Sequence, residues 1–180
     1  AGLPALPVAG RTLKNWSAFS MNLLASDKET LKWRTIKMAY LFDTDAISEL
    51  LRPHPLPVYV KWLVSISRED QYTSAVVVGE LYKRAYRSQS KQRHLDNIEQ
   101  RILPAVTSLP YDVATAKVFG QIRAHLEETG NILPDADLQI AATAIYHGLE
   151  LISGNLRHFA RIPGLKLNPV LADARSESDS

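Results

Sequence analysis

From residue 38 onward, short apolar runs alternate with segments in which apolar residues recur at helical spacing. The short runs are typical of buried strands, and the helical spacing is typical of amphipathic helices. The predicted strands are residues 39–43, 71–74, 106–109, 149–153 and 166–167. The predicted helices are residues 46–51, 58–66, 76–87, 91–103, 112–128, 135–147 and 156–161. Alternation with short connections predicts one α/β domain with a mainly parallel central sheet flanked by helices.

The two ends of the chain do not share this pattern. Residues 38–170 are predicted to form the α/β domain, and the polar residues 171–180 are predicted to be a disordered tail. Residues 1–37 form an N-terminal extension that opens with AGLPALPVAG and shows no clear period. It is interpreted either as a docking arm, which packs through residues such as Trp16 and Trp33, or as sequence upstream of the native protein.

The second interpretation rests on Trp33 and Arg34. If the Arg34 codon is AGG, the DNA reads TGGAGG, which resembles a bacterial ribosome-binding site three codons before Met38. The hypothesis is that the native protein starts at Met38. A CGN codon at Arg34 would remove the motif.

Composition limits the function classes. The chain is 46% hydrophobic and 22% charged, as expected for a domain with a buried core, and its net charge of +2 does not by itself indicate a nucleic-acid partner. It has no cysteine, which excludes disulfides, thiolate catalysis and cysteine metal sites and permits a reducing compartment. No apolar run is long enough to span a membrane, and the N-terminus is a poor signal peptide.

Three carboxylates stand where acids are normally avoided. Asp43 ends the strand YLFD, Glu80 follows three valines, and Asp137 opens the apolar helix DLQIAATAIY. Each alone has a plain interpretation: Asp43 as a helix N-cap, Glu80 as a surface residue, and Asp137 as first-turn compensation of the helix dipole. Together they favour a cation, because like charges raise one another's pKa. All-oxygen ligands suit Mg²⁺ or Mn²⁺ better than Zn²⁺.

Four stretches carry a family resemblance: YLFDTDAISELLR, YTSAVVVGEL, DADLQIAATAIYHGLELISGN and LRHFARIPGLKLNP. From residue 38 to about residue 170 the chain resembles a PIN-domain ribonuclease of the VapC/FitB type, a toxin of a bacterial toxin–antitoxin pair. The resemblance implies a PIN-like fold, with Asp43, Glu80 and Asp137 as the metal-binding acids. Asn155 occupies the position of a fourth acidic or amide residue of the catalytic site.

The resemblance also implies roles for three neighbours of the acids. Thr44 and Ser153 are the small hydroxyl residues beside them. Asp135 is either a helix-start acid or an outer ligand of the metal, with the first interpretation favoured. The five histidines are expected to have no catalytic role: His94, His125, His147 and His158 as helix-surface or packing residues, and His54 in a proline-rich loop.

The implied reaction is metal-assisted hydrolysis of RNA phosphodiester bonds, which leaves 5′-phosphate and 3′-hydroxyl ends. The implied cofactor is Mg²⁺, with Mn²⁺ as the alternative. The implied partners are an RNA substrate, a second copy of the chain in a homodimer, and a cognate antitoxin, all in the cytoplasm and with no membrane contact.

A basic segment follows Glu80 directly. Residues 81–93 carry five cations and no acid: Lys83, Arg84, Arg87, Lys91 and Arg93. RNA phosphate binding is one interpretation; a solvated helix face and a surface for an acidic antitoxin are the others. Tyr82 and Tyr86 are favoured as core or dimer-face residues.

Two other functions are weighed against the nuclease. A catalytically silent PIN-like module that binds RNA or protein is expected to lack one of the three acids, and all three are present. An Asp-x-Asp phosphatase would use Asp43 and Asp45 and needs an acid pair after a late strand, whereas ELISGN ends in Gly154 and Asn155. Asp45 is therefore interpreted as a helix-start residue.

Overall fold

Five short strands form one parallel sheet: β1 (Tyr40–Phe42), β2 (Gln71–Ser74), β3 (Thr107–Leu109), β4 (Glu150–Ile152) and β5 (Lys166–Asn168). Their order across the sheet is β3-β2-β1-β4-β5, and every neighbouring pair runs parallel. The sequence prediction of a mainly parallel α/β sheet is confirmed. The computed structural model describes residues 38–178, so the interpretations of residues 1–37 lie outside the described residues.

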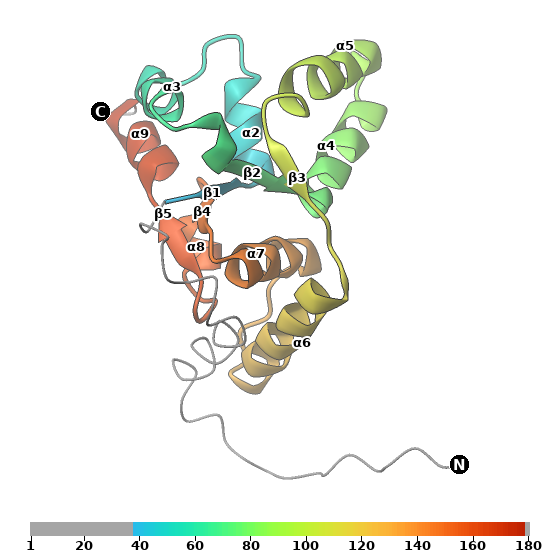
Figure 1. Cartoon of the computed structure of the whole chain (residues 1–180), viewed down its shortest axis with the longest axis vertical. Coiled ribbons are helices and arrows are strands. Elements are labelled where there is room, and N and C mark those ends of the chain that lie inside the picture. Colours follow the sequence, from blue (N-terminus) through green and yellow to red (C-terminus); the bar gives the residue numbers. More distant parts are fainter. Residues whose placement is uncertain (1–37, 179–180) are drawn as a thin grey trace. The chain divides into compact units, whose positions relative to one another are not determined.

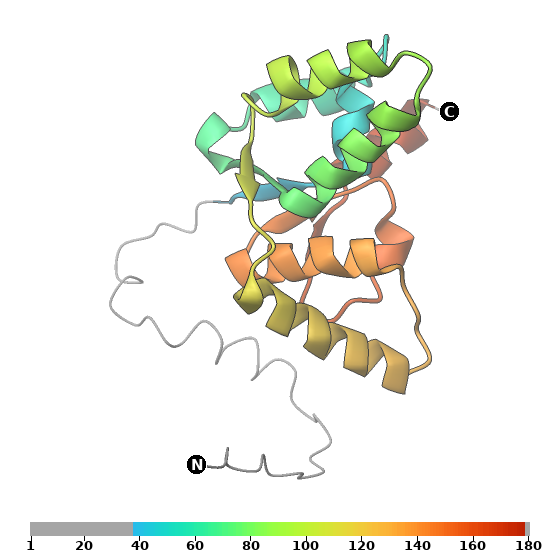
Figure 2. The same ribbon diagram turned by 90° about the vertical axis from the view of Figure 1, so that its right-hand side faces the viewer.

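Helices cover both faces of the sheet (Figures 1 and 2). Helices α2, α3, α4 and α5 lie on one face, and α6 and α7 lie on the other (Figure 1). Their bounds are α2 (Thr44–Leu50), α3 (Pro57–Val64), α4 (Ala75–Arg87), α5 (Lys91–Asn97), α6 (Val113–Glu128), α7 (Asp135–His147), α8 (Leu156–Phe159) and α9 (Val170–Ser178). Two irregular turns complete the described chain, a 3₁₀ turn at Arg68–Asp70 and a π-helical turn at Ile98–Ile102.

The core lies where the central strands are covered on both sides. Leu41, Leu151 and Ile152 are fully buried, as are Leu138 and Ala141 of α7. Strands buried on both faces read as continuous apolar runs, which is why YLF and ELI were recognisable in the sequence. The small residues of α7 let that helix approach the sheet closely.

Local signals place several helix ends as the sequence predicted. The Asp112 side chain accepts a hydrogen bond from the backbone N–H of Thr115 and caps α6. Gly148 ends α7 in the left-handed conformation, with φ of 69°. These ends depend only on residues within one helical turn.

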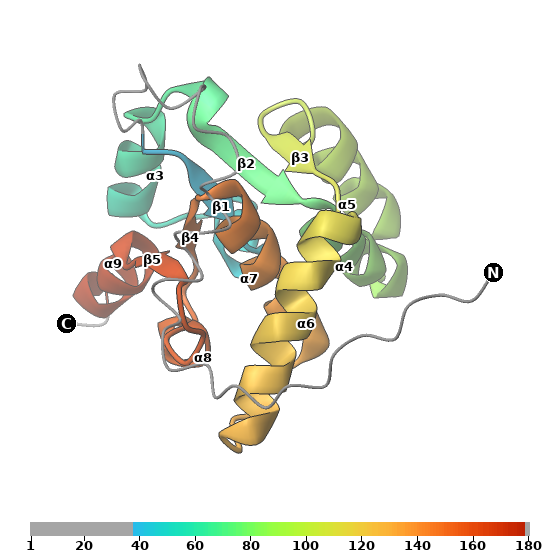
Figure 3. The same cartoon turned by 60° about the horizontal axis from the view of Figure 1, so that its bottom comes forward.

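The C-terminal segment differs from its prediction. Residues 171–180 were expected to be disordered, but Val170–Ser178 forms α9, in which Leu171 and Ala174 are buried. Figure 3 shows α9 beside α3. The polar composition concealed two apolar residues that face the domain, so the prediction was wrong for the described part of this segment. No helix among residues 38–178 is both long enough and apolar enough to cross a membrane.

Candidate active site

The candidate site lies where the strand order changes direction. β1 and β4 are neighbours in the sheet although they are far apart in the chain, and Phe42 pairs with Ile152 at their carboxyl ends. The backbone N–H of Asp43 donates to the carbonyl of Ile152 across 3.1 Å. Asp43 and Ser153 therefore leave neighbouring strands side by side, at the position where open parallel sheets bind their ligands.

Asp43 is both a helix cap and a buried acid. Its Oδ1 accepts a hydrogen bond of 2.7 Å from the backbone N–H of Ala46, so the N-cap interpretation is confirmed. The side chain is only 5% exposed. Burial raises the pKa of Asp43 to about 6, while the hydrogen bonds from Ser153 and the Ala46 N–H oppose the rise. The carboxylate has neutral donors around it and is costly to ionise.

Glu80 is connected to Asp43 indirectly, by a hydrogen bond from the next residue, Thr44. Thr44 is the first residue of α2, and its hydroxyl donates a short hydrogen bond to Oε2 of Glu80 in the second turn of α4. Thr44 is buried, so this bond joins two helices on the same face of the sheet. The interpretation of Glu80 as a surface residue does not fit this contact, because Glu80 is only partly exposed.

Asp137 lies in the first turn of α7, with Oδ2 3.4 Å from Nδ1 of His158 on α8. Burial raises the pKa of Asp137, the contact with His158 lowers it, and the nearby charge of Glu80 raises it again. Asp137 and Glu80 are therefore within electrostatic reach of each other. His158 lies on α8 with 43% of its side chain exposed, as expected for a helix-surface residue. No spacing signal in the sequence pairs it with Asp137.

The loop after β4 supplies two further predicted residues. Ser153 is fully buried, and its hydroxyl accepts a hydrogen bond of 2.9 Å from the backbone N–H of Asn155. The Asn155 side chain is exposed and makes no hydrogen bond to the part of the chain that the structure describes. It is thus available to a ligand at the rim of the site.

Two aspartates beside the site are paired with arginines. Asp45 receives two hydrogen bonds from Arg175 of α9, at 2.7 and 3.0 Å. Asp135 receives one from Arg123 of α6, at 2.7 Å. These contacts fit the helix-start interpretations of both residues, and they engage Asp45 in an ion pair instead of leaving it as the second acid of a phosphatase.

All five cations of the basic segment are exposed on α4 and α5: Lys83, Arg84, Arg87, Lys91 and Arg93. Tyr82 and Tyr86 stack with ring centroids 6.2 Å apart, and the Lys91 ammonium lies 4.9 Å from the Tyr86 ring. Tyr86 is 59% exposed, so a core position is wrong for it. The predictions of RNA binding and of a dimer face here remain predictions.

Comparison with known proteins identifies the family of this chain. The family described as PIN domain matches residues 40–165. The chain is 37% identical over 134 residues to Toxin FitB of Neisseria gonorrhoeae, a match that covers 72% of this chain and 96% of FitB. The protein is a member of the PIN-domain family of FitB and VapC toxins. It is also 32% identical to Ribonuclease VapC2 of Haemophilus influenzae, with 72% of this chain and 96% of that protein covered.

Solved structures of PIN-domain toxins agree with the fold. The VapBC2 complex of Rickettsia felis bound to a promoter DNA fragment superimposes with a TM-score of 0.68 at 26% identity, covering 73% of this chain and 98% of that one. The FitAcB complex of Neisseria gonorrhoeae gives a TM-score of 0.64 at 36% identity, covering 72% and 97%. The sequence resemblance to the VapC/FitB type is confirmed.

The donor set of this PIN domain suits a hard divalent cation. Asp43, Glu80 and Asp137 offer carboxylate oxygens, and burial raises the pKa values of Asp43 and Asp137. Among residues 38–178, no three histidine or carboxylate side chains are grouped at metal-binding distance. Glu80 is bonded to Thr44 and Asp137 to His158, so gathering them around one ion requires rotation of these two side chains.

Proposed function

We propose that this PIN-domain protein is a Mg²⁺-dependent endoribonuclease toxin that hydrolyses RNA to 5′-phosphate and 3′-hydroxyl ends. Mn²⁺ is expected to replace Mg²⁺, because both prefer oxygen ligands in octahedral geometry. Asp43, Glu80 and Asp137 would hold the ion. One observation carries the proposal: a carboxylate that is 5% exposed stands at the switch point of the sheet with neutral hydrogen-bond donors and a raised pKa.

The surrounding residues position these acids. Ser153 and the Ala46 N–H hold the Asp43 carboxylate, Thr44 holds Glu80, and His158 holds Asp137. A bound divalent ion supplies a Lewis acid that lowers the pKa of water and stabilises negative charge at the phosphoryl group. Partner groups of this kind set the orientation and basicity of ligands, and their loss reduces activity or metal affinity about 10- to 100-fold.

His158 has a second role in the proposed reaction. Its imidazole lies at the mouth of the site, 3.4 Å from Asp137 and partly exposed. An imidazole can give or take a proton near neutral pH.

The proposal extends to partners. The curated relatives are named ribonuclease and toxin, and the solved neighbours are toxin–antitoxin complexes. We infer that a cognate antitoxin silences this protein, that it forms a homodimer, and that it acts on cytoplasmic RNA. The cations of α4 and α5 support RNA phosphate contacts, since all five are exposed on the helix that carries Glu80 or on the helix that follows it.

The test is cleavage of a mixed RNA pool by the purified protein with Mg²⁺, Mn²⁺ or EDTA. We expect cleavage with either metal, none with EDTA, and 5′-phosphate ends on the products. Asp43→Asn keeps a side chain that can cap α2 but removes the negative charge, so it should abolish cleavage without unfolding the protein. Circular dichroism of this variant is the folding control.

The result that contradicts the proposal is equally specific. Cleavage by wild type that persists in EDTA, or in Asp43→Asn, would show that the carboxylate site is not the catalytic centre. If no pool is cut with any metal although antitoxin is absent, the alternative is a silent PIN-like module that binds RNA or protein. Calorimetric titration with Mg²⁺ then reports whether the three carboxylates take up the ion.

A further inference from the structure

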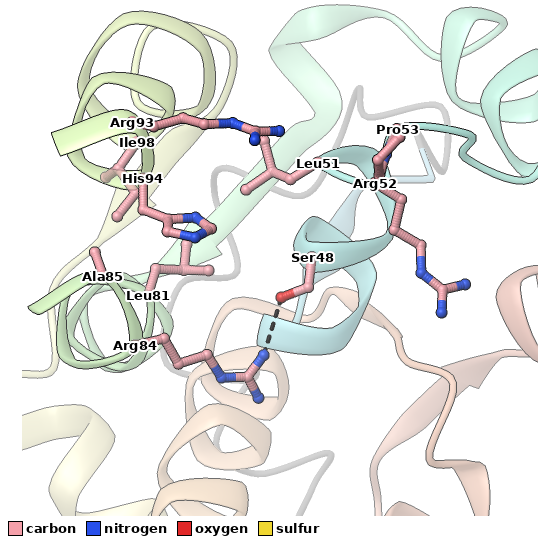
Figure 4. Close-up of a pocket in the computed structure, with 10 residues that line it drawn as sticks. All are labelled: Ser48, Leu51, Arg52, Pro53, Leu81, Arg84, Ala85, Arg93, His94 and Ile98. Atoms are coloured by element: carbon pink, nitrogen blue, oxygen red, sulfur yellow. Dashed lines mark hydrogen bonds between the residues drawn. The ribbon is translucent and has the colours of Figure 1, made fainter. Parts of the chain in front are cut away.

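A second feature lies beside the acids, in the seam between α2 and the helices α4 and α5. It is a pocket of about 400 Å³, drawn in Figure 4. Its floor is apolar and is made by Leu51, Leu81, Ala85 and Ile98, three of which are buried. This volume is in the range of small-molecule sites.

The rim of the pocket is cationic. Arg84 of α4 and Arg93 and His94 of α5 are exposed around the apolar floor, and the lining contains no aspartate or glutamate. In Figure 4 the Arg93 side chain reaches across from α5 toward Leu51, the residue that follows α2, and the His94 ring lies next to Leu81. Arg52 points away from these groups and donates to Glu49 across 3.2 Å, so it belongs to another network.

A series of hydrogen bonds between α2 and α4 connects this pocket to Glu80, one of the proposed catalytic acids. Thr44 donates to Glu80, and four residues further along both helices Arg84 donates to Ser48 across 3.0 Å. Ser48 in turn donates to the Thr44 carbonyl across 2.6 Å. Four residues are about one helical turn, or ~6 Å along the axis. The pocket therefore begins about one turn beyond the acids, on the same pair of helices.

An apolar floor with a cationic rim fits a flat base joined to an anionic phosphate. Single-stranded RNA is recognised in this way, with bases splayed out onto apolar, aromatic or guanidinium surfaces. An RNA strand whose scissile phosphate lies at the acids extends away from them on both sides. The hydrogen-bonded residues of α2 and α4 run from the acids to the pocket, so one neighbouring nucleotide can reach it. Its size suits one nucleotide better than a helical protein segment, which favours RNA over an acidic partner.

We propose that this pocket receives the base of one nucleotide that flanks the scissile phosphate of a single-stranded RNA. Arg84 and Arg93 contact its phosphates, and His94 contacts the base. The inference rests on the proposed ribonuclease function and deepens it, because it assigns base preference at one position next to the cut to these residues. The other cations, Lys83, Arg87 and Lys91, lie outside the pocket lining.

The experiment maps cut sites in a random-sequence single-stranded RNA pool by sequencing the 5′-phosphate ends. Wild type is compared with Arg93→Ala and His94→Ala, which change exposed residues and should leave the fold intact. Lys117→Ala is the matched control, since Lys117 is an exposed cation on α6, on the opposite face of the sheet. Both pocket variants should reduce the base preference at one flanking position about fivefold or more, whereas Lys117→Ala should keep it.

Failure of the pocket and failure of the nuclease give different results. If wild type cuts and the pocket variants keep its base preference, the pocket assignment is overturned and the nuclease stands. If wild type does not cut, fluorescence anisotropy with a labelled RNA pool decides. Binding weakened fivefold or more by Arg93→Ala but not by Lys117→Ala supports the pocket. Equal binding by all proteins overturns it and leaves an acidic protein segment as the occupant.

Discussion

Two aspartates at the start of α2, only two residues apart, have opposite surroundings. Asp45 forms a two-bond ion pair with Arg175, and the buried Glu49 one turn later accepts from Arg52 and Arg175, each at 3.2 Å. Asp43 is more deeply buried than Asp45, yet its hydrogen-bond donors are neutral. Among residues 38–178, no lysine or arginine pairs with Asp43, Glu80 or Asp137.

The difference separates structural acids from candidate metal ligands. An acid that stabilises the fold is neutralised within the protein by an arginine, which satisfies its charge permanently. An acid that binds a cation must keep its charge uncompensated until the ion arrives, and burial then raises its pKa. On one short helix, Asp45 is therefore paired with Arg175 of α9, while Asp43 is the acid that we propose as a metal ligand.

The largest expected effect comes from removing one charge among the three acids that have no lysine or arginine partner within residues 38–178. Glu80→Gln and Asp137→Asn should each lower RNA cleavage about 100-fold or more, since loss of a ligand exceeds the about 10- to 100-fold effect of losing its supporting groups. Single-turnover cleavage with Mg²⁺ measures this. Asp135→Asn, on the same helix as Asp137 but paired with Arg123, is the control and should cut at nearly the wild-type rate.

A pH experiment sharpens the contrast for Asp43. Its pKa is raised to about 6 in the folded protein, so the native state binds the proton more tightly than the unfolded chain does. In EDTA, wild type should therefore gain stability as pH falls from above 6 toward 4, by about 2 kcal/mol from this group alone. Urea unfolding at several pH values measures the gain.

Asp43→Asn should remove that dependence and make the protein more stable than wild type at pH 7 without metal. Asparagine still accepts the hydrogen bond from the Ala46 N–H, so the helix cap is retained. Equal pH dependence in wild type and variant would mean that Asp43 titrates as an ordinary exposed acid. The difference between the surroundings of Asp43 and Asp45 would then have no energetic consequence.

The structural side of the comparison is tested by Arg175→Met. This change keeps the aliphatic stem but removes the partner of Asp45 and one of the partners of the buried Glu49. The free energy of unfolding should fall by on the order of 2 kcal/mol, because Glu49 loses a charged hydrogen-bond donor. A double-mutant cycle with Asp45→Asn, read by urea denaturation, isolates the pair. A coupling energy near zero would show that the Asp45–Arg175 pair contributes nothing to holding α9, which would leave the Glu49 contact and apolar packing.

The smallest effect concerns Gly154, which lies against that ion pair. A Cβ at this position would overlap the guanidinium of Arg175 and the carboxylate of Asp45. Because both are ends of side chains that can move, Gly154→Ala should cost only about 1 kcal/mol. The loss should shrink in the Arg175→Met background, where the obstructing group is absent. An unchanged loss in that background would mean that the overlap with the Asp45 carboxylate, and not with Arg175, sets the cost.

Helices α7 and α9 show what could and could not be predicted from the sequence. The bounds 135–147, the Gly148 end and the parallel sheet were all recognisable from the sequence, because apolar period and capping residues act over one or two turns. The tail was misjudged because its two buried residues, Leu171 and Ala174, are too few to make a pattern. Their burial depends on a surface made by α3, far away in the chain.

The strand–helix alternation, the helix ends, the family resemblance and the three acids that break the apolar pattern can all be recognised in the sequence alone. Which acids are paired with an arginine becomes visible only in the folded protein. Asp45 and Arg175 are 130 positions apart, and His158 meets Asp137 across 21. Local patterns report on neighbours along the chain, whereas charge compensation depends on which side chains the completed fold brings together. The roles of Asp43 and Asp45, two residues apart in the sequence, were therefore separated by the fold.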